Sequence, residues 1–209
     1  MDYRFLVLVA LGDSMTVGYQ SPSPENPRGT DFPYTRVLEQ LVWSEIRQRD
    51  LTNLGVIVEN EGVNGDKIEG MITRFNPRVT RHKPNYVIIW TGFNDLHPTI
   101  KIQDNINNLQ KLYHMTRSIG AEPIGCSLTP GKTLFHNLRI VEFNKAIQSL
   151  CSSESIIYVD LFDVMTDSEG KLDKQYYNDG HLSNKGYTKV AETIFKKAIK
   201  GILSNFTPV

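Results

Sequence analysis

The stretch that decides the fold is Phe5-Leu-Val-Leu-Val-Ala-Leu11, followed directly by Gly12-Asp13-Ser14-Met15. An unbroken apolar run of this length predicts a strand buried on both faces of a sheet, and the Gly-Asp-Ser turn marks its end. Open α/β folds bind their ligands at the carboxyl ends of such strands. Ser14 is therefore a candidate nucleophile, although a single serine after a strand is more often a helix cap.

Further short apolar runs alternate with segments in which apolar residues recur at helical spacing. This alternation predicts an α/β protein with a central parallel sheet of five strands flanked by helices. No repeat or low-complexity linker interrupts it, so we expect a single domain over residues 1–209. The expected strands are 5–11, 56–60, 86–90, 123–127 and 156–160, and the expected helices are 34–49, 67–81, 102–119, 134–150 and 183–203, the last with Ser183 as its N-cap.

Composition excludes several classes of function. Lys plus Arg and Asp plus Glu both number 23, so no net charge favours nucleic acid. Cys126 and Cys151 have no close-spaced partner motif, which favours buried reduced thiols in a cytoplasmic protein. The first apolar run lacks a signal-peptide cleavage site, and no stretch is long enough to span a bilayer, so we expect no stable membrane insertion. The oligomeric state is left unknown.

Polar, Gly-rich loops follow two further strands, and another polar, Gly-containing segment precedes the last helix. Asp179-Gly180-His181 precedes the last helix, and a histidine base is what a serine needs to become a nucleophile. Gly62 lies in the loop 60–66 and Asn94 in the loop 92–95, where a backbone N–H and a side-chain amide can together form an oxyanion hole. The sequence of either loop alone is typical of a turn, but the placement of both loops at strand ends favours an active site.

These segments, in this order, resemble the blocks of the SGNH or GDSL-type hydrolases. The matching stretches are Gly12-Asp13-Ser14, Asn60-x-Gly62, Gly92-x-Asn94-Asp95 and His181-Leu182, and the resemblance covers nearly the whole chain. It implies a flavodoxin-like three-layer α/β/α sandwich and a serine esterase that works through an acyl-enzyme intermediate. By this likeness Ser14 is the nucleophile and His181 the base, and the N–H groups of Ser14 and Gly62 with the Asn94 side chain bind the oxyanion.

One position departs from the family pattern. The family's acid stands three residues before the histidine, where this chain has Asn178; Asp179 stands two residues before it. We expect Asp179 to orient His181, with Asp160, Asp163 and Asp173 as weaker candidates.

The expected partner is a small-molecule ester: a lipid ester, a thioester or an acetylated sugar. No cofactor or metal is expected, because the five histidines are scattered without ligand-like spacing. Residues 21–33, with four prolines, and the loop 128–137 are expected to shape the substrate pocket, and Phe93 is expected to pack or to touch substrate.

Two alternatives belong to other classes. Gly131-Lys132-Thr133 follows a strand and precedes a helix, as in phosphate-binding loops, but Cys126 occupies the place of the required first glycine and Pro130 removes an N–H. The second alternative is a catalytically weak module that binds an acyl group or a carbohydrate on the same fold.

Overall fold

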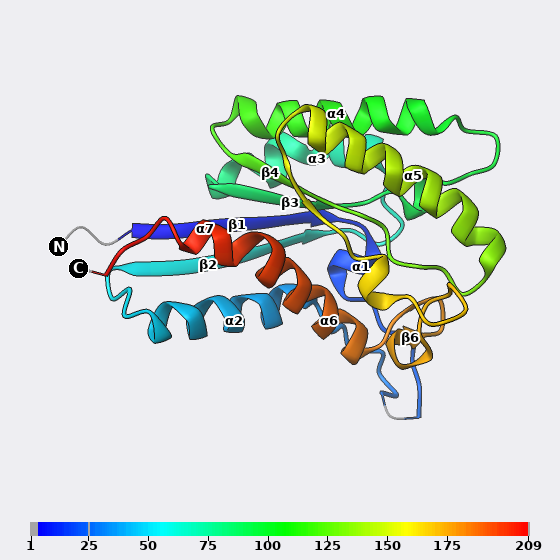
Figure 1. The fold of residues 1–209 in the computed structure, drawn as a ribbon, viewed down its shortest axis with the longest axis horizontal. Helices are drawn as coiled ribbons and strands as arrows, with labels where there is room; N and C mark the ends of the chain where they lie inside the picture. The colour runs from blue at the N-terminus through cyan, green and yellow to red at the C-terminus, as the bar shows by residue number, and fades with distance from the viewer. Residues whose placement is uncertain (1–3, 25, 209) are drawn as a thin grey trace.

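A parallel five-stranded sheet forms the centre of the protein. The structure is a computed structural model that describes residues 4–24 and 26–208 (Figure 1). The strand order is β2-β1-β3-β4-β5, and every predicted strand is present within two residues of its expected ends. The strands are β1 (Arg4–Gly12), β2 (Leu54–Gly62), β3 (Tyr86–Trp90), β4 (Glu122–Cys126) and β5 (Ile157–Val159).

The register brings the ends of the three strands β2, β1 and β3 to one level. Gly12, the last residue of β1, is paired with Gly62 of β2 and with Trp90 of β3. The chain order along the sheet reverses between β1 and β3, which is the topological switch point where open α/β sheets bind ligands. The loops that follow these strands therefore meet at one edge of the sheet.

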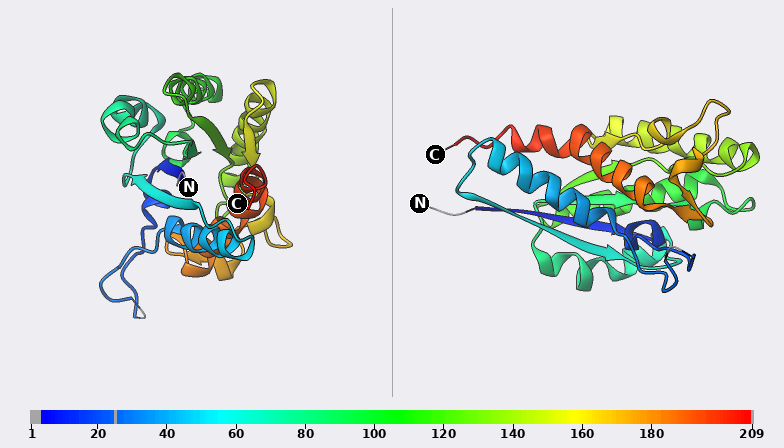
Figure 2. Two further views of the ribbon diagram at one scale, coloured as in Figure 1. Left: turned by 90° about the vertical axis from the view of Figure 1, so that its left-hand side faces the viewer. Right: turned by 90° about the horizontal axis from the view of Figure 1, so that it is seen from below.

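Helices cover both faces of the sheet, as Figure 2 (left) shows along the strands. In β1, Leu8 and Ala10 face the layer that contains α2 and α6, whereas Val9 and Leu11 face the layer of α3, α4 and α5. Burial on both faces explains why β1 is continuously apolar. The predicted three-layer α/β/α fold is confirmed. The long helices are α2 (Tyr34–Gln48), α3 (Ile68–Arg78), α4 (Ile102–Ser118), α5 (Leu134–Ser153) and α6 (Asn184–Ile194).

The last helix begins where the sequence predicts and continues through a change of pitch. Ser183 Oγ accepts a hydrogen bond from the N–H of Gly186 at 3.2 Å, so the predicted N-cap is confirmed. After α6 the chain forms a π-helical turn, η5 (Phe195–Ile199), and then α7 (Lys200–Leu203). Ala198 and Ile199 stay buried in the core, so the apolar face continues through the turn.

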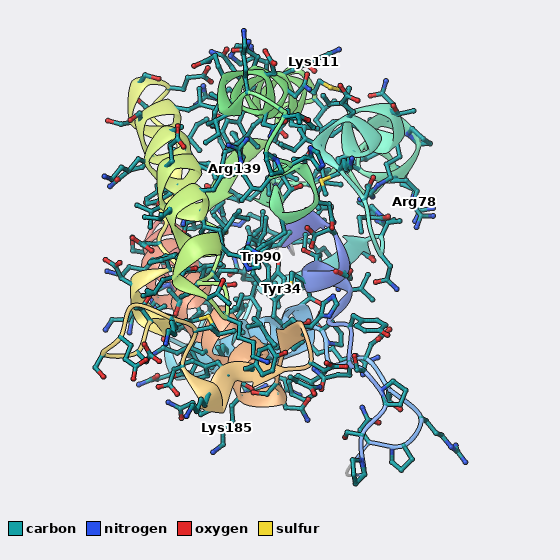
Figure 3. The ribbon with its side chains drawn as sticks, turned by 90° about the vertical axis from the view of Figure 1, so that its right-hand side faces the viewer. Tyr34, Arg78, Trp90, Lys111, Arg139 and Lys185 are labelled. Atoms are coloured by element: carbon teal, nitrogen blue, oxygen red, sulfur yellow. The ribbon has the colours of Figure 1, made fainter. Side chains whose placement is uncertain are left out.

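Short elements gather at the carboxyl edge of the sheet, at the right of Figure 1. Residues 21–33 include no helix or strand in the part that the structure describes, and Figures 1 and 3 show this segment extending away from the body of the protein. Cys126 and Cys151 are buried free thiols, as predicted. The short elements at the carboxyl edge are α1 (Ser14–Val17), η2 (Phe93–Asp95), η3 (Asp163–Met165), η4 (Lys174–Tyr176), β6 (Tyr177–Asn178) and β7 (His181–Leu182), whereas η1 (Thr80–His82) leads from α3 into the start of β3.

Candidate active site

Ser14 lies where β1 ends and α1 begins, at the edge of the sheet onto which Figure 3 looks. Oδ1 of Asp13 accepts a hydrogen bond from the N–H of Met15 at 2.9 Å and so caps α1. Because Ser14 is the first residue of this helix, its own N–H has no acceptor within the helix. The turn therefore directs both a hydroxyl and a backbone donor toward the carboxyl edge of the sheet.

His181 reaches Ser14 from the other end of the chain. Nε2 of His181 lies 2.9 Å from Oγ of Ser14, within hydrogen-bond distance. The ring of Tyr19 packs against the imidazole, with the ring centroids 4.7 Å apart. Burial lowers the pKa of His181 below its ordinary value of 6.5, and this effect outweighs the opposing influence of the Asp179 backbone and charge. The imidazole is thus mainly neutral at pH 7, the form that can accept a proton.

The structure corrects the prediction for Asp179. Its side chain is exposed, and Nδ1 of His181 is buried without a hydrogen-bond partner among the described residues. The Asp179 backbone lies near enough to raise the pKa of the imidazole, but no hydrogen bond of normal geometry joins the two. The predicted Ser14–His181–Asp179 triad is therefore not assembled.

A β-hairpin turn explains where Asp179 points. Asn178 and His181 are paired across the antiparallel strands β6 and β7, so Asp179 and Gly180 form the two-residue turn between them. Both turn residues have positive φ, 38° and 87°, as a type I′ turn requires. The carboxylate is consequently at the tip of the hairpin. The Asp179-Gly180 dipeptide marks this turn in the sequence.

Asn178 occupies the position of the family's acid, but its side chain hydrogen-bonds Gln20 and not His181. Its Nδ2 donates to Oε1 of Gln20 at 2.9 Å. Gln20 is itself buried, and its Nε2 donates to the carbonyl oxygen of Leu182 at 2.6 Å. This pair of amides fastens the hairpin that carries His181 to the segment that follows α1.

Asn94 lies near Ser14 in the loop that follows β3. Its Nδ2 donates one hydrogen bond, to the carbonyl oxygen of Asp66 at 2.8 Å, and its second N–H is not used by that bond. The next residue, Asp95, is buried and accepts from the N–H of Ile68 at 3.3 Å, at the start of α3. Burial raises the pKa of Asp95 to about 6. These contacts tie the loop after β3 to the loop after β2.

The predicted role of Gly62 does not fit its surroundings. Its N–H donates to Oδ1 of Asn60 at 2.9 Å, so this donor is already engaged. A Cβ at this position would lie 2.4 Å from the backbone nitrogen of Val17. Gly62 is therefore a glycine because α1 packs directly against β2, and it is not positioned as an oxyanion donor.

Gly65, three residues after Gly62, has the open surroundings that an oxyanion donor requires. It has a φ of 73°, and a Cβ there would meet no atom within 4 Å, so its backbone is exposed to open space. It precedes Asp66, whose carbonyl accepts the hydrogen bond from Asn94. The Asn64-Gly65 dipeptide marks this turn in the sequence, but turn chemistry alone does not identify a functional N–H.

A cavity of about 430 Å³ joins these groups. Ser14, Asn94 and His181 all line it. Residues 129–132 line it too, which agrees with the expectation for the loop 128–137, and so does Phe93. The expectation for the segment 21–33 was wrong, because none of its described residues lines the cavity; the segment projects from the body of the protein beside this edge instead.

The remaining acid candidates lie at or just before the starts of the 3₁₀ helices η3 and η4. Asp160 accepts from the N–H of Phe162 at 2.8 Å, and Asp173 accepts from the N–H of Gln175 at 3.0 Å. Asp163 is the first residue of η3. In the described part of the chain, none of these carboxylates hydrogen-bonds the imidazole at the edge of the sheet.

The loop that resembles a phosphate-binding loop has other partners. The N–H of Gly131 donates to Oδ1 of Asn137 at 2.6 Å. The ammonium of Lys132 lies 4.7 Å from the centre of the Tyr177 ring. The Gly131 N–H and the Lys132 ammonium, which a phosphate-binding loop would use for its ligand, thus have partners within the protein. Among residues 4–24 and 26–208, no group of three or more His, Cys, Asp and Glu side chains could hold a metal ion, and no helix is long and apolar enough to cross a membrane.

Comparison with known proteins gives the family. The model of the GDSL-like lipase/acylhydrolase family matches residues 10–189, which is most of the chain. The chain belongs to this family. It is accordingly a carboxylic ester hydrolase. Membership of this family favours the esterase over the two alternatives, a binding module and a nucleotide-binding protein. A search of the curated proteins finds no match.

Solved structures agree with the fold of this hydrolase. A lipase/acylhydrolase from Enterococcus faecalis has 22% identical residues and a TM-score of 0.73, with 98% of each chain covered. A GDSL-like lipase from Bacteroides thetaiotaomicron has 22% identity and a TM-score of 0.68, covering 94% of this chain and 89% of the other. An acetylxylan esterase from Geobacillus stearothermophilus has 19% identity and a TM-score of 0.71, covering 92% and 93%. At these identities the likeness concerns the fold.

Proposed function

We propose that this hydrolase cleaves its ester through an acyl-enzyme intermediate, with Ser14 as the nucleophile and His181 as the general base. The observation that carries the proposal is the 2.9 Å separation between Oγ of Ser14 and Nε2 of His181 at the carboxyl edge of the sheet. A serine hydroxyl is a weak nucleophile unless a base within hydrogen-bond reach accepts its proton.

In the first half of the reaction, Oγ of Ser14 bonds to the ester carbonyl carbon while its proton passes to Nε2 of His181. The carbonyl oxygen becomes an oxyanion. The carbon–oxygen bond to the alcohol then breaks, and the alcohol leaves with the proton from His181. In the second half, water donates a proton to His181, attacks the acyl-serine carbonyl, and releases the acid as Ser14 regains its proton.

Three donors are suited to the oxyanion. They are the N–H of Ser14, the N–H of Gly65 and the second N–H of the Asn94 amide. The hydrogen bond from Asn94 to the Asp66 carbonyl supports this set, because it holds the amide beside Gly65. Each donor that strengthens its bond as charge develops lowers the barrier by about 3 kcal/mol.

The base works in this proposal without a carboxylate partner. Tyr19 packs on the imidazole, and the bond between Asn178 and Gln20 holds the hairpin that carries it. Packing and the hairpin therefore position the ring, while burial keeps its pKa low. A neutral ring so placed can accept the Ser14 proton but lacks the extra stabilisation that a buried carboxylate gives an imidazolium.

Ser14→Ala tests the proposal. We expect kcat/KM for p-nitrophenyl acetate to fall by about 10³-fold or more, because among the described residues no other hydroxyl hydrogen-bonds the imidazole of His181. Ser149→Ala, at an exposed position on α5, is the matched control and keeps full activity. Full turnover by a folded Ser14→Ala protein would contradict the assignment of the nucleophile.

A further inference from the structure

A second cavity adjoins the first. It has a volume of about 590 Å³ and lies between the loop that follows β3 and the first turns of α5. The two cavities share Phe93, His136 and Ile140 in their walls. The two cavities therefore adjoin at these side chains, and a substrate held at Ser14 lies next to the second space.

The wall of the second cavity is largely apolar. Leu96, Pro98 and Leu138 line it in addition to the shared Phe93 and Ile140. Leu138 is 74% exposed at the rim, an unusual position for a large apolar side chain on a helix surface. Such a wall favours an aliphatic group over a sugar, whose hydroxyls would lose their hydrogen bonds to water there.

Arg139, labelled in Figure 3, lines this cavity and hydrogen-bonds the loop on its other side. One terminal nitrogen of its guanidinium, Nη2, donates to the carbonyl oxygens of His97, at 2.9 Å, and of Ile100. The guanidinium thus connects the loop after η2 to α5 and fixes the spacing between these two walls of the cavity. Nη2 of Arg139 is engaged with these carbonyls, and the Glu142 carboxylate in the same wall disfavours an anionic ligand.

The chemistry at Ser14 decides which half of the ester faces the second cavity. The leaving alcohol must receive its proton from Nε2 of His181, so it lies on the side of the pocket formed by His181, Gly180 and Tyr177. The acyl group extends from the carbonyl carbon in another direction. Phe93, next to the proposed oxyanion donor Asn94, marks the opening on that other side.

We infer that the second cavity binds the acyl chain, and that the substrates of this hydrolase are esters of aliphatic acids longer than acetate. The inference rests on the proposed function, because it takes the acyl group to be attached to Ser14. Methylene groups that leave water gain about 0.8 kcal/mol each, which is a factor of about four in kcat/KM. The gain continues until the chain reaches the open rim near Leu138.

Two isomeric esters test this inference, methyl octanoate and heptyl acetate. They have the same formula and similar hydrophobicity, but the long chain is in the acid in one and in the alcohol in the other. We expect kcat/KM for methyl octanoate, followed by acid release in a pH-stat below the solubility limit, to be at least about tenfold higher. Equal rates, or a preference for heptyl acetate, would overturn the inference.

Two leucine variants on α5 locate the effect. Leu138→Gln should lower the ratio of the two kcat/KM values by about threefold or more, because an amide at the rim would have to be desolvated. Leu134→Gln is the matched control: Leu134 is also exposed on α5 but lines neither cavity, and we expect its ratio to stay at the wild-type value. An equal ratio in both variants would contradict the position of the subsite.

The same measurements separate this inference from the proposed function. If Ser14→Ala hydrolyses both isomers at the wild-type rate, the nucleophile is wrong and the acyl-chain assignment falls with it. If Ser14→Ala abolishes hydrolysis of both isomers but the wild type does not prefer methyl octanoate, the proposed function stands and only the subsite is refuted.

Discussion

At the scale of single residues, the account depends on the pair formed by Ser14 and His181, with the Asp179 carboxylate outside it. A buried carboxylate behind a catalytic histidine fixes the tautomer and stabilises the imidazolium, and its loss costs about 10⁴ in kcat in a serine protease. Here the hairpin turn directs Asp179 to solvent, and Nδ1 of the imidazole has no partner in the described part of the chain. The sequence motif and the three-dimensional arrangement thus predict opposite outcomes for one substitution.

Asp179→Asn distinguishes them. The structure predicts that kcat for a short-chain ester falls less than about tenfold, since only a solvent-screened charge is removed from near the ring. Asparagine also tolerates the left-handed backbone of this turn, so the hairpin is retained. Steady-state kinetics at pH 7.5 provide the check, and a fall of about 10²-fold or more would restore Asp179 as the orienting acid.

The pH dependence follows from the environment of His181. Burial lowers its folded-state pKa, so the neutral, proton-accepting form predominates at a lower pH than for a histidine in water. We expect log kcat/KM to rise with pH along one limb whose midpoint lies below 6.5, and then to stay level through pH 8. A midpoint clearly above 6.5 would show that a carboxylate stabilises the imidazolium in the working enzyme.

At the scale of elements, the ends of the strands could be predicted from the sequence better than the roles of the residues beyond them. Continuous apolar runs mark strands buried on both faces, and all of the expected strands and long helices are present. The strands of the hairpin β6–β7, of two residues each, leave no periodicity to detect, so the Asp179-Gly180 dipeptide is the signal in the sequence for this hairpin. Gly62 was given the wrong role because sequence does not show that α1 packs against it.

Two glycine variants test this correction. Gly62→Ala places a Cβ against the backbone of α1, and we expect it to lower the free energy of unfolding by about 1–3 kcal/mol. In Gly65→Ala the added Cβ contacts no atom, so we expect only the strain of the positive φ to lower the free energy of unfolding, by about 1 kcal/mol. Urea unfolding measures both, and a Gly62→Ala protein as stable as the wild type would contradict the packing described for β2 and α1.

At the scale of the whole molecule, the register of the sheet assembles a site from segments far apart in the chain. Ser14 follows β1, Asn94 follows β3, and His181 comes from a hairpin after β5. The alternation of elements predicts a parallel sheet, but it does not give the shape of the two cavities. Their walls come from loops after β3 and β4 and from α5, whose mutual positions depend on tertiary contacts such as those of Arg139.

Burial of Asp13 beneath the site links the stability of the whole protein to pH. Burial raises its pKa from 3.8 in water to about 7, so the folded state holds a proton that the unfolded chain releases. The protonated form favours folding at low pH, and this contribution is lost as pH rises from about 4 through about 7. Asp13→Asn, which keeps the capping oxygen, should therefore stabilise the protein more at pH 8 than at pH 5. Urea unfolding at both pH values checks this, and an equal effect at both would contradict the raised pKa.

Covalent labelling of the site tests the central claim most directly. A fluorophosphonate reacts with a serine only when a neighbouring base activates it, and it forms a stable bond to Oγ. We predict that the wild-type protein gains one phosphonyl group, that peptide mass spectrometry locates it on Ser14, and that hydrolysis of methyl octanoate stops in proportion to the label. Ser14→Ala should gain none. Labelling of a different residue, or full activity in protein whose Ser14 is completely labelled, would contradict the account.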